Sequence, residues 1–382
     1  MKETYNIPTL PLSYDLETKA VMRQLNSANK RLAELKGIAH TIPNENILIN
    51  TLVLQEACDS SAVENIVTTR DDLYRAELDL KGEIVNVATK EVMNYREAMQ
   101  VGFNVVKRHK LLTLNDIKTI QQKLEANNAG FRTLPGTKLK SSRGEVVYVP
   151  PQDIAQINSL MSNLETYIND AQMQDIDPLI KLAVIHHQFE SIHPFYDGNG
   201  RTGRILSILY LVINDLLDLP ILYLSRYITH NKGEYYRLIQ AIRDNDGDNA
   251  SQWEEWILFI LKGIEETAVQ TIDIVKGISR LMAEFKSKLR PVFGKRYKHE
   301  LLNNLFFHPY TKIEFIEKDL MVQRKTATNY LEQIVELGLL EKVKKGRSNY
   351  YMNTSLISLF LDLPTMNEDD MEVINSSCID KL

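Results

Sequence analysis

Twelve consecutive residues near the middle of the chain, 193–204, combine side chains that can do chemistry with glycines that can bind an anion. They read His-Pro-Phe-Tyr-Asp-Gly-Asn-Gly-Arg-Thr-Gly-Arg. His193 is a candidate general base for a hydroxyl, since an imidazole with an ordinary pKa of about 6.5 changes charge near neutral pH. Asp197 offers the hard carboxylate oxygens that suit Mg²⁺ bridging phosphates. We therefore expect a base and a metal ligand four residues apart.

The second half of this stretch is suited to phosphate. Gly198 and Gly200 tolerate backbone angles that turn successive N–H groups toward one point, which makes an anion-binding nest. The next helix is expected to start near Arg201, so its positive end points at the same place. Arg201 and Arg204 share a helix face, and each carries a planar guanidinium that matches phosphate oxygens. The pattern indicates a polyphosphate site.

These residues also fit other kinds of site. The spacing of residues 198–203 matches the G-x-G-x-x-G dinucleotide pattern, but that fingerprint follows a strand, and residues 179–192 are a helix-length run. A zinc site built from His186, His187 and His193 lacks a cysteine or carboxylate at ligand spacing. A structural histidine beside a tight glycine connection is the remaining alternative.

The elements that must position this stretch are helices. Asp177 and Pro178 form a cap and first turn that begin a helix over 179–191. Residues 205–217 are apolar on every side, which predicts a buried central helix. A break at 59–61 is expected, with Ser60 capping a short new helix near 60–66. Further helices are predicted at 15–35, 47–58, 71–80, 83–105, 113–124, 154–171, 232–244 and 253–289.

Two other regions have patterns of their own. Residues 130–151 are rich in glycine, proline and β-branched residues and predict a hairpin with its turn near 141–144. Arg290-Pro291 opens a C-terminal section, in which 311–320 and 324–337 read as a helix-turn-helix followed by a β-hairpin wing. If this section binds DNA, the residues early in the second helix would contact bases (Gln323, Arg324, Lys325, Thr326 and Asn329), and a basic wing would contact phosphates (Lys342, Lys344, Lys345 and Arg347). The alternative is a winged helix that makes dimer contacts or presents protein targets.

Composition sets broad limits. The chain has 382 residues, a formal net charge of −5 and two cysteines. These values are typical of a protein from a reducing compartment and argue against general nucleic-acid binding. The N-terminus lacks the apolar core of a signal peptide, and the longest apolar run, 205–219, is too short and polar to span a bilayer. We expect a cytoplasmic protein.

The central stretch resembles the Fic family signature HPFx(D/E)GNGRxxR and matches it at every defined position. The resemblance extends over residues 5–290, and it implies a mainly α fold. On this basis the expected parts are an N-terminal helical region (1–110), a Fic-type core with a β-hairpin flap (111–290), a winged helix (291–360) and a flexible tail (361–382). The hairpin would bind the target backbone as an added strand.

This resemblance also implies an activity: transfer of AMP from ATP to a Ser, Thr or Tyr hydroxyl of a protein, with release of pyrophosphate. His193 would then be the base, Asp197 would hold Mg²⁺, and Arg204 would bind the γ-phosphate. The run implied to bind ATP is Gly198, Asn199, Gly200, Arg201, Thr202, Gly203 and Arg204. A family inhibitory motif, (S/T)xxxE(G/N), fits Ser60 to Asn65, so Glu64 would compete with the γ-phosphate for Arg204.

Further expectations stay open at this point. Asn231, Tyr235 and Tyr236 resemble the adenine-side region of the family, although plain core packing would equally explain Tyr235. The family resemblance suggests a homodimer. The alternatives to AMP transfer are a DNA-binding regulator with a nucleotide-sensing core, use of another nucleotide donor, and removal of AMP with Glu64 positioning water.

Overall fold

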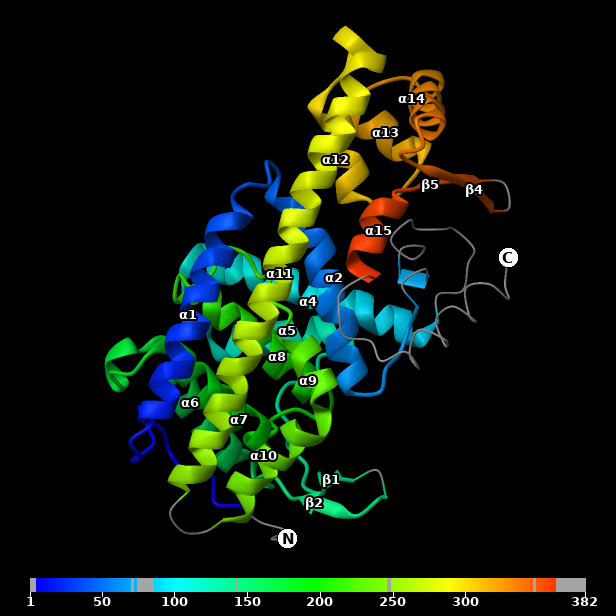
Figure 1. The fold of residues 1–382 in the computed structure, drawn as a ribbon. Coiled ribbons are helices and arrows are strands. Elements are labelled where there is room, and N and C mark those ends of the chain that lie inside the picture. The colour runs from blue at the N-terminus through cyan, green and yellow to red at the C-terminus, as the bar shows by residue number, and fades with distance from the viewer. Residues whose placement is uncertain are drawn as a thin grey trace. The chain divides into compact units, whose positions relative to one another are not determined.

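The computed structural model describes residues 5–69, 72–73, 86–141, 143–245, 249–345 and 348–361. Helices make up most of this part of the chain, so the prediction of a mainly α fold is confirmed (Figure 1). The chain divides into two compact units, residues 1–272 and 273–382. The expected helix at 71–80 and the tail lie almost entirely outside the described residues. No described helix is long and apolar enough to cross a membrane.

Two consecutive buried helices form the centre of the first unit. The helix α7, Pro178–Ile192, begins where the Asp177 carboxylate accepts the N–H of Leu179, with Pro178 in its first turn, as predicted. The helix α8, Asn199–Ile213, packs against α7 and is buried on nearly every side. The loop between them carries His193 and the glycines. A helix buried all round has a fixed position, so the loop is held at both ends.

Amphipathic helices surround this pair, and each buries one face. The helix α5 starts with a capping box in which Thr113 and Asp116 satisfy each other's backbone N–H groups. The surrounding helices are α1 (Lys19–Ala39), α4 (Val87–His109), α5 (Leu114–Glu125), α6 (Ile154–Asn169), α9 (Leu224–His230) and α10 (Lys232–Asp244), with a 3₁₀ turn, η1, at Ala171–Met173.

The helix α2, Glu45–Val63, differs from expectation. It is continuous, so the predicted break at 59–61 and the new helix capped by Ser60 are wrong. Ser60 and Ser61 are fully buried in its last turns. Asp and Ser prefer caps to helix interiors by less than about 1 kcal/mol each, and burial of this turn against α4, α8 and α9 outweighs that preference.

The predicted hairpin is present as two short antiparallel strands, β1 (Leu139–Lys140) and β2 (Val146–Tyr148). Leu139 pairs with Tyr148. The turn closes where the Ser141 carbonyl accepts the N–H of Gly144 at 2.9 Å. Gly144 has a φ of 81°, which explains the glycine at this position.

The second unit begins inside a long helix. The helix α11, Ala250–Phe293, continues through Pro291, so the chain does not break at 290–291, where a new section was expected. After the 3₁₀ turn η2 (Gly294–Arg296), the expected order of helices and strands follows. The elements are α12 (His299–Phe307), β3 (Tyr310–Thr311), α13 (Ile313–Leu320), α14 (Arg324–Glu336), β4 (Glu341–Lys345), β5 (Ser348–Met352) and α15 (Thr354–Leu361), with antiparallel strand order β3-β5-β4.

Candidate active site

His193 lies immediately after α7, in a left-handed conformation with a φ of 49°. Its N–H is bonded to the carbonyl of Phe189 at 2.9 Å, which ends the helix at this residue. Burial, together with the nearby guanidinium groups of Arg243 and Arg132, lowers the pKa of the His193 imidazole to about 3. The imidazole is therefore neutral at physiological pH, the protonation state that a general base requires.

The glycine loop opens the first turn of α8. Gly198 precedes this helix with a φ of 75°, and no described side chain caps the helix. The side chain of Asn199 accepts the N–H of Phe195 at 2.8 Å and donates to its carbonyl at 2.9 Å, so Asn199 braces the loop. A Cβ added at Gly200 would lie 2.3 Å from Oε1 of Glu64. Glycine is needed there for a carboxylate to approach the helix terminus.

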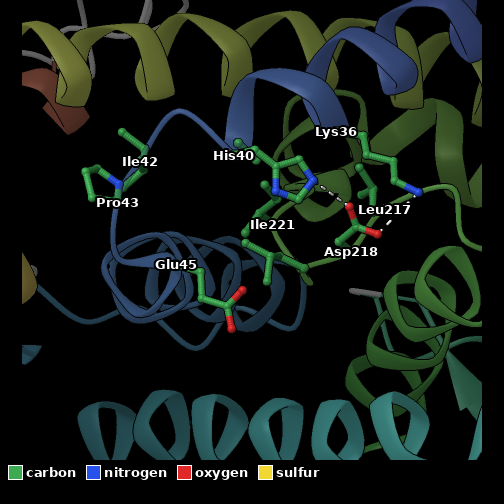
Figure 2. A pocket seen from close by; sticks show the side chains of 10 residues that line it. Lys36, His40, Ile42, Pro43, Glu45, Leu217, Asp218 and Ile221 are labelled. Atoms are coloured by element: carbon green, nitrogen blue, oxygen red, sulfur yellow. Dashed lines mark hydrogen bonds and ion pairs between the residues drawn. The ribbon is translucent and has the colours of Figure 1, made fainter.

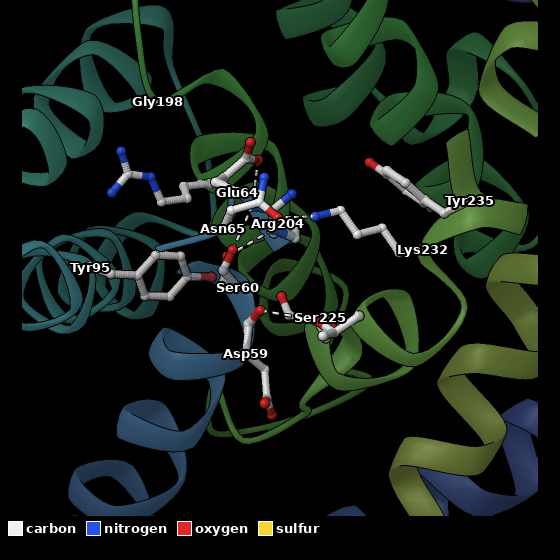
Figure 3. Close-up of polar contacts among 12 residues, drawn as sticks. Asp59, Ser60, Glu64, Asn65, Tyr95, Gly198, Arg204, Ser225, Lys232 and Tyr235 are labelled. Atoms are coloured by element: carbon white, nitrogen blue, oxygen red, sulfur yellow. Dashed lines mark hydrogen bonds and ion pairs between the residues drawn. The ribbon is translucent and has the colours of Figure 1, made fainter. Parts of the chain in front are cut away.

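The guanidinium of Arg204 is buried and holds the end of α2 (Figure 3). Nε donates to the Ser60 hydroxyl at 2.8 Å, and Nη2 donates to the Ser60 carbonyl at 2.9 Å. Nη2 also pairs with Oε1 of Glu64 at 2.9 Å. Burial alone would raise the pKa of Glu64, but the positive charge of Arg204 prevails and lowers it below its ordinary value. The two side chains form an ion pair at the mouth of the nest.

The conformation of the chain after α2 brings Glu64 to this position. Glu64 is the first residue past the helix, and Asn65 follows with a φ of 62°. The N–H of Ile66 bonds back to the carbonyl of Ser61 at 3.0 Å, which closes the helix end. Asn tolerates the left-handed region better than other non-glycine residues. Lys232 also donates to the Asn65 amide oxygen at 2.8 Å (Figure 3).

A buried carboxyl, Glu56, anchors α2 one turn before Ser60. Its oxygens accept from the Tyr95 hydroxyl of α4 at 3.1 Å and from the N–H of Ser225 of α9 at 3.2 Å. The Ser225 hydroxyl also donates to it. Sequence analysis did not identify Glu56. The signal was a single acid inside an apolar run of α2, which is a position that must be paired when buried.

Arg201 is held by a different pair of acids. Its guanidinium is 4% exposed and bonds Glu91 of α4 and Glu125 of α5, both at 2.9 Å. The Glu125 carboxylate also lies against Gly198, where a Cβ would meet Oε1 at 2.2 Å. The two arginines of the motif therefore have separate acidic partners. Neither Glu91 nor Glu125 was found from sequence, because their partner is more than seventy residues away.

Asp197 is exposed beside the nest, and its Oδ1 accepts the N–H of Gly198 at 2.8 Å. Among the described residues there is no group of three His, Cys, Asp or Glu side chains that could hold a metal. Asp197 fits a Mg²⁺ ion that takes its other ligands from phosphate and water, the usual manner for this ion.

The zinc alternative receives no support from the histidines. The ring nitrogens of His186 bond the Ser207 hydroxyl at 2.9 Å and the Tyr235 hydroxyl at 2.8 Å. Nε2 of His187 lies 3.3 Å from the Ile239 carbonyl. Both rings are buried in the core, where these nitrogens contact core side chains and a main-chain carbonyl.

The residues expected on the adenine side occupy different environments. Tyr235 is 1% exposed and packs among Trp256 and Phe259, so its ring belongs to the core. Tyr236 is 45% exposed, although partial burial, together with the negative charge of Glu64, raises the pKa of its hydroxyl. Asn231 uses its amide to donate to the Tyr227 carbonyl at 2.9 Å between α9 and α10. Of the three, Tyr236 is the side chain open to a ligand.

The remaining motif residues are buried in α8. Thr202 is fully buried, and its hydroxyl has no hydrogen-bond partner among the described residues. A Cβ at Gly203 would lie 2.9 Å from Oε1 of Glu190 and 3.0 Å from Phe189. Gly203 thus allows α8 to approach α7 closely.

A separate hollow of about 330 Å³ lies between the end of α1 and the loop after α8 (Figure 2). Lys36 and His40 both pair with Asp218 there, at 3.2 Å and 2.9 Å. Its floor is apolar, with Leu217 and Ile221 among the lining residues. No motif residue lines it, so the charged groups of this hollow serve to tie the loop to α1.

Three models of known families match the chain. Residues 22–104 match the N-terminal region of the Fic/DOC family, and residues 111–211 match the Fic/DOC family itself. Residues 281–356 match the C-terminal domain of SoFic-like protein adenylyltransferases. The motif and its two helices lie within the second match.

Individual relatives and structures agree with these matches. The chain is 26% identical over 224 residues to Protein adenylyltransferase Fic of Aedes aegypti and 22% identical over 188 residues to Protein adenylyltransferase fic-1 of Caenorhabditis elegans. The match to the Aedes aegypti protein covers 58% of this chain and 40% of that protein. The match to the Caenorhabditis elegans protein covers 48% of this chain and 34% of that protein. The chain therefore spans well under half the length of either relative. A crystal structure of a Fic family protein from Desulfovibrio desulfuricans G20 superposes with a TM-score of 0.56 at 18% identity, over 91% of this chain and 98% of that one. That likeness shows a shared fold.

Proposed function

We propose that this chain, which belongs to the Fic/DOC family, transfers AMP from ATP to a hydroxyl side chain of a protein and releases pyrophosphate, and that Glu64 restrains the reaction. One observation carries the proposal: the buried Arg204, in the N-terminal part of α8, is paired with Glu64 and lies eleven residues along the chain from the neutral base His193. A buried cation paired with a removable acid is a site that a phosphate can take over.

The chemistry requires few groups. The target hydroxyl gives its proton to the neutral His193 imidazole while its oxygen bonds to the α-phosphorus of ATP. The bond between that phosphorus and the bridging oxygen to the β-phosphate breaks, and pyrophosphate leaves with the electron pair. The base contributes about 10²–10⁴-fold, and the rest comes from alignment and charge neutralisation.

The first turn of α8 supports binding of the triphosphate. The amides after Gly198 would receive the α- and β-phosphates together with Arg201, and Arg204 would receive the γ-phosphate. Asn199 keeps the loop in this shape through Phe195. Asp197 would hold Mg²⁺, which neutralises phosphate charge when bound.

The restraint follows from electrostatics. A carboxylate 2.9 Å from Arg204 uses the charge that the γ-phosphate needs, and its position beside Gly200 adds a negative charge at the nest. ATP would then bind only in a displaced pose. Release of Glu64 would free Arg204 and remove the repulsion.

Positional labelling of ATP tests the reaction class. The purified protein and its Glu64→Gly variant are incubated with Mg²⁺ and with ATP labelled at the α- or the γ-phosphorus, and proteins are separated by gel. We expect covalent label from the α-position alone. Label from the γ-position would contradict AMP transfer and indicate phosphoryl transfer.

Two related activities are separated by the same assay. If another nucleotide is the donor, its α-labelled form labels protein more strongly than ATP does. If the chain removes AMP, a pre-labelled target loses label on addition of the wild type and keeps it with Glu64→Gly, because water positioned by Glu64 would be the nucleophile. We expect neither result.

The partners we propose are a target protein and a second copy of this chain. The target would present a hydroxyl to His193 along the β1–β2 hairpin. A homodimer is what family membership suggests, and light scattering coupled to size exclusion measures it directly. A monomer at all accessible concentrations would contradict the second partner.

DNA is a weaker candidate partner for the C-terminal unit. Its helix and strand order resembles a winged helix, but Arg324 at the start of α14 is paired with Glu314 at 2.7 Å, and Lys342 of β4 is paired with Glu332 at 2.6 Å. An exposed cation that must first give up an acidic partner gains less from a DNA phosphate. Arg347 lies outside the described residues. Gel shifts with random duplex DNA at 50 mM salt should therefore show no salt-sensitive complex; such a complex would favour a DNA-binding regulator.

A further inference from the structure

Four consecutive carbonyls, those of residues 191–194, accept hydrogen bonds from one distant segment of the chain. The last carbonyls of a helix, and those just past its end, are usually left to water or to a cap. Here the donors all come from residues 132–148, the segment that forms the hairpin and its approach. The bonds are Tyr148 hydroxyl to Ser191 at 2.7 Å, Arg132 Nη2 to Ile192 at 3.3 Å, Arg132 Nε to His193 at 2.8 Å and Arg132 N–H to Pro194 at 2.9 Å.

Arg132 makes three of these four bonds, and its side chain is 1% exposed. Burying a guanidinium is costly, and burial lowers the pKa of Arg132 because no described acid pairs with it to offset the cost. Within the described part of the chain, its guanidinium donates to main-chain carbonyls, and its buried Nη1 has no hydrogen-bond partner. A buried cation kept for backbone contacts alone indicates that those contacts serve a purpose.

The backbone beside Arg132 is itself tied to the catalytic loop. The Tyr196 hydroxyl accepts the N–H of Thr133 at 2.9 Å and that of Leu134 at 3.1 Å. The ring of Phe131 packs on Phe195 with 5.1 Å between centroids. The main chain on both sides of Arg132 is therefore held in place by contacts with the catalytic loop.

His193, whose carbonyl accepts a hydrogen bond from Arg132, has an unfavourable backbone conformation. A φ of 49° costs a residue with a side chain roughly 1–2 kcal/mol. His193 keeps this conformation only if its surroundings impose it. The direction of the imidazole follows from that φ, so the bond from Nε of Arg132 to the His193 carbonyl sets where the base points.

We propose that Arg132 is a positioning residue for the reaction: it fixes the main chain of His193, and through it the imidazole, where the target hydroxyl gives up its proton. This inference rests on the proposed function, in which His193 is the base. Arg132 touches neither ATP nor the hydroxyl. The Tyr148 hydroxyl adds a smaller contribution by holding the carbonyl of Ser191, two residues before His193.

Kinetics of Arg132 variants in the released background Glu64→Gly test this role. Arg132→Ala should lower kcat by about 100-fold, the usual cost of misplacing a catalytic group by an ångström, while KM for ATP stays within twofold. Added guanidinium ion should restore part of the rate, because it can refill the space and the hydrogen bonds. The kcat of Arg132→Lys should lie between that of Arg132→Ala and that of the Glu64→Gly parent. Arg108→Ala, which removes an exposed arginine of α4, is the matched control and should leave kcat unchanged.

The pH profile gives a readout that a merely structural residue would not move. The Arg132 charge helps to keep the His193 imidazole unprotonated. Its loss in Arg132→Ala should shift the acid limb of kcat/KM to higher pH, and Arg132→Lys should leave that limb in place. An unchanged kcat and an unchanged limb in a folded Arg132→Ala or Arg132→Lys protein would overturn the proposal, as would a loss confined to KM.

Failure of the proposed function gives a different result, since the Glu64→Gly parent would then not label at all. In that case the NMR signal of the His193 ring replaces activity as the readout. The proposal still requires that signal to move or broaden in Arg132→Lys and to stay in place in Arg108→Ala. An unmoved signal in both variants would contradict it.

Discussion

In the proposed function, Arg204 is the residue for which Glu64 and the γ-phosphate of ATP would compete. The Arg204 side chain is nearly inaccessible, at 1% exposure, whereas the Glu64 side chain is 36% exposed. Removing one partner of a buried pair leaves an uncompensated charge, which costs several kcal/mol unless another anion arrives. The same cost that makes the pair firm makes the freed arginine a strong phosphate ligand.

The tyrosines of α10 give a prediction at the residue scale. Tyr236→Ala should raise KM for ATP by roughly fivefold, because an exposed aromatic ring contributes about 1 kcal/mol when it stacks on a base. Its melting temperature should change little. Steady-state labelling of the Glu64→Gly background with varied ATP measures this.

Tyr235→Phe is the comparison variant. It should leave KM unchanged and lower the free energy of unfolding by about 1 kcal/mol, since it removes the hydroxyl that bonds the buried His186. If Tyr235→Phe raised KM while Tyr236→Ala did not, the assignment of the open side chain would be wrong.

The residues of the motif could be identified from sequence because their chemistry is local. His193, Gly198 and Arg204 lie within one loop and one helix turn, so spacing alone predicts that they converge. Arg132 and Glu56 could not be found this way. Their partners lie 61 and 169 residues along the chain, and only the packing of α2, α7 and the hairpin brings them together.

At the scale of elements, the last turn of α2 connects the restraint to the fold. Glu56 and Ser60 fix this turn against α4, α8 and α9, and the left-handed Asn65 ends it. Glu64 therefore reaches Arg204 only while the turn is intact. Local loosening of one helix end would release the site without unfolding the unit.

Substitution of Asn65 tests that connection. Asn65→Val places a β-branched residue at a φ of 62°, which is strained by more than 1 kcal/mol, so the turn should loosen and labelling should rise to a level between wild type and Glu64→Gly. Asn65→Gly keeps the backbone conformation and should label like wild type. It loses the hydrogen bond from Lys232, but that bond is exposed. Equal labelling by Asn65→Val and Asn65→Gly would show that the helix end does not control Glu64.

The helices themselves were largely predictable. The periodicity of α7, α8, α13 and α14 gave their positions within a few residues, because each has a clear cap or a continuous buried face. The end of α2 was not predictable, since Asp59, Ser60 and Ser61 have local preferences against a helix interior. The burial of the two serines is a tertiary effect, and single-sequence patterns do not report it.

At the scale of the whole molecule, buried neutral histidines make stability depend on pH. Burial lowers the pKa of both His186 and His193 to about 3, below the value of about 6.5 expected in the unfolded chain. As the pH falls below about 6.5, the unfolded chain binds protons that the folded chain refuses. Stability is therefore full above that pH and is lost toward the folded values.

Denaturant unfolding between pH 7 and pH 5 measures this loss. The free energy of unfolding of wild type should fall as the pH falls. The corresponding slope for His186→Gln should be smaller by up to about 1.4 kcal/mol per pH unit, because the variant lacks one group that binds a proton on unfolding. His109→Gln, which replaces an exposed histidine, should follow wild type. A His186→Gln slope equal to that of wild type would contradict a neutral buried ring.

The restraint of a nucleotide site by Glu64 is the central claim, and intact-protein mass spectrometry after incubation with ATP and Mg²⁺ tests it most directly. We predict that wild type gains little AMP, that Glu64→Gly gains at least tenfold more, and that the double variant Glu64→Gly/His193→Ala gains none. Equal AMP incorporation by wild type and Glu64→Gly, or undiminished incorporation by the double variant, would contradict the account.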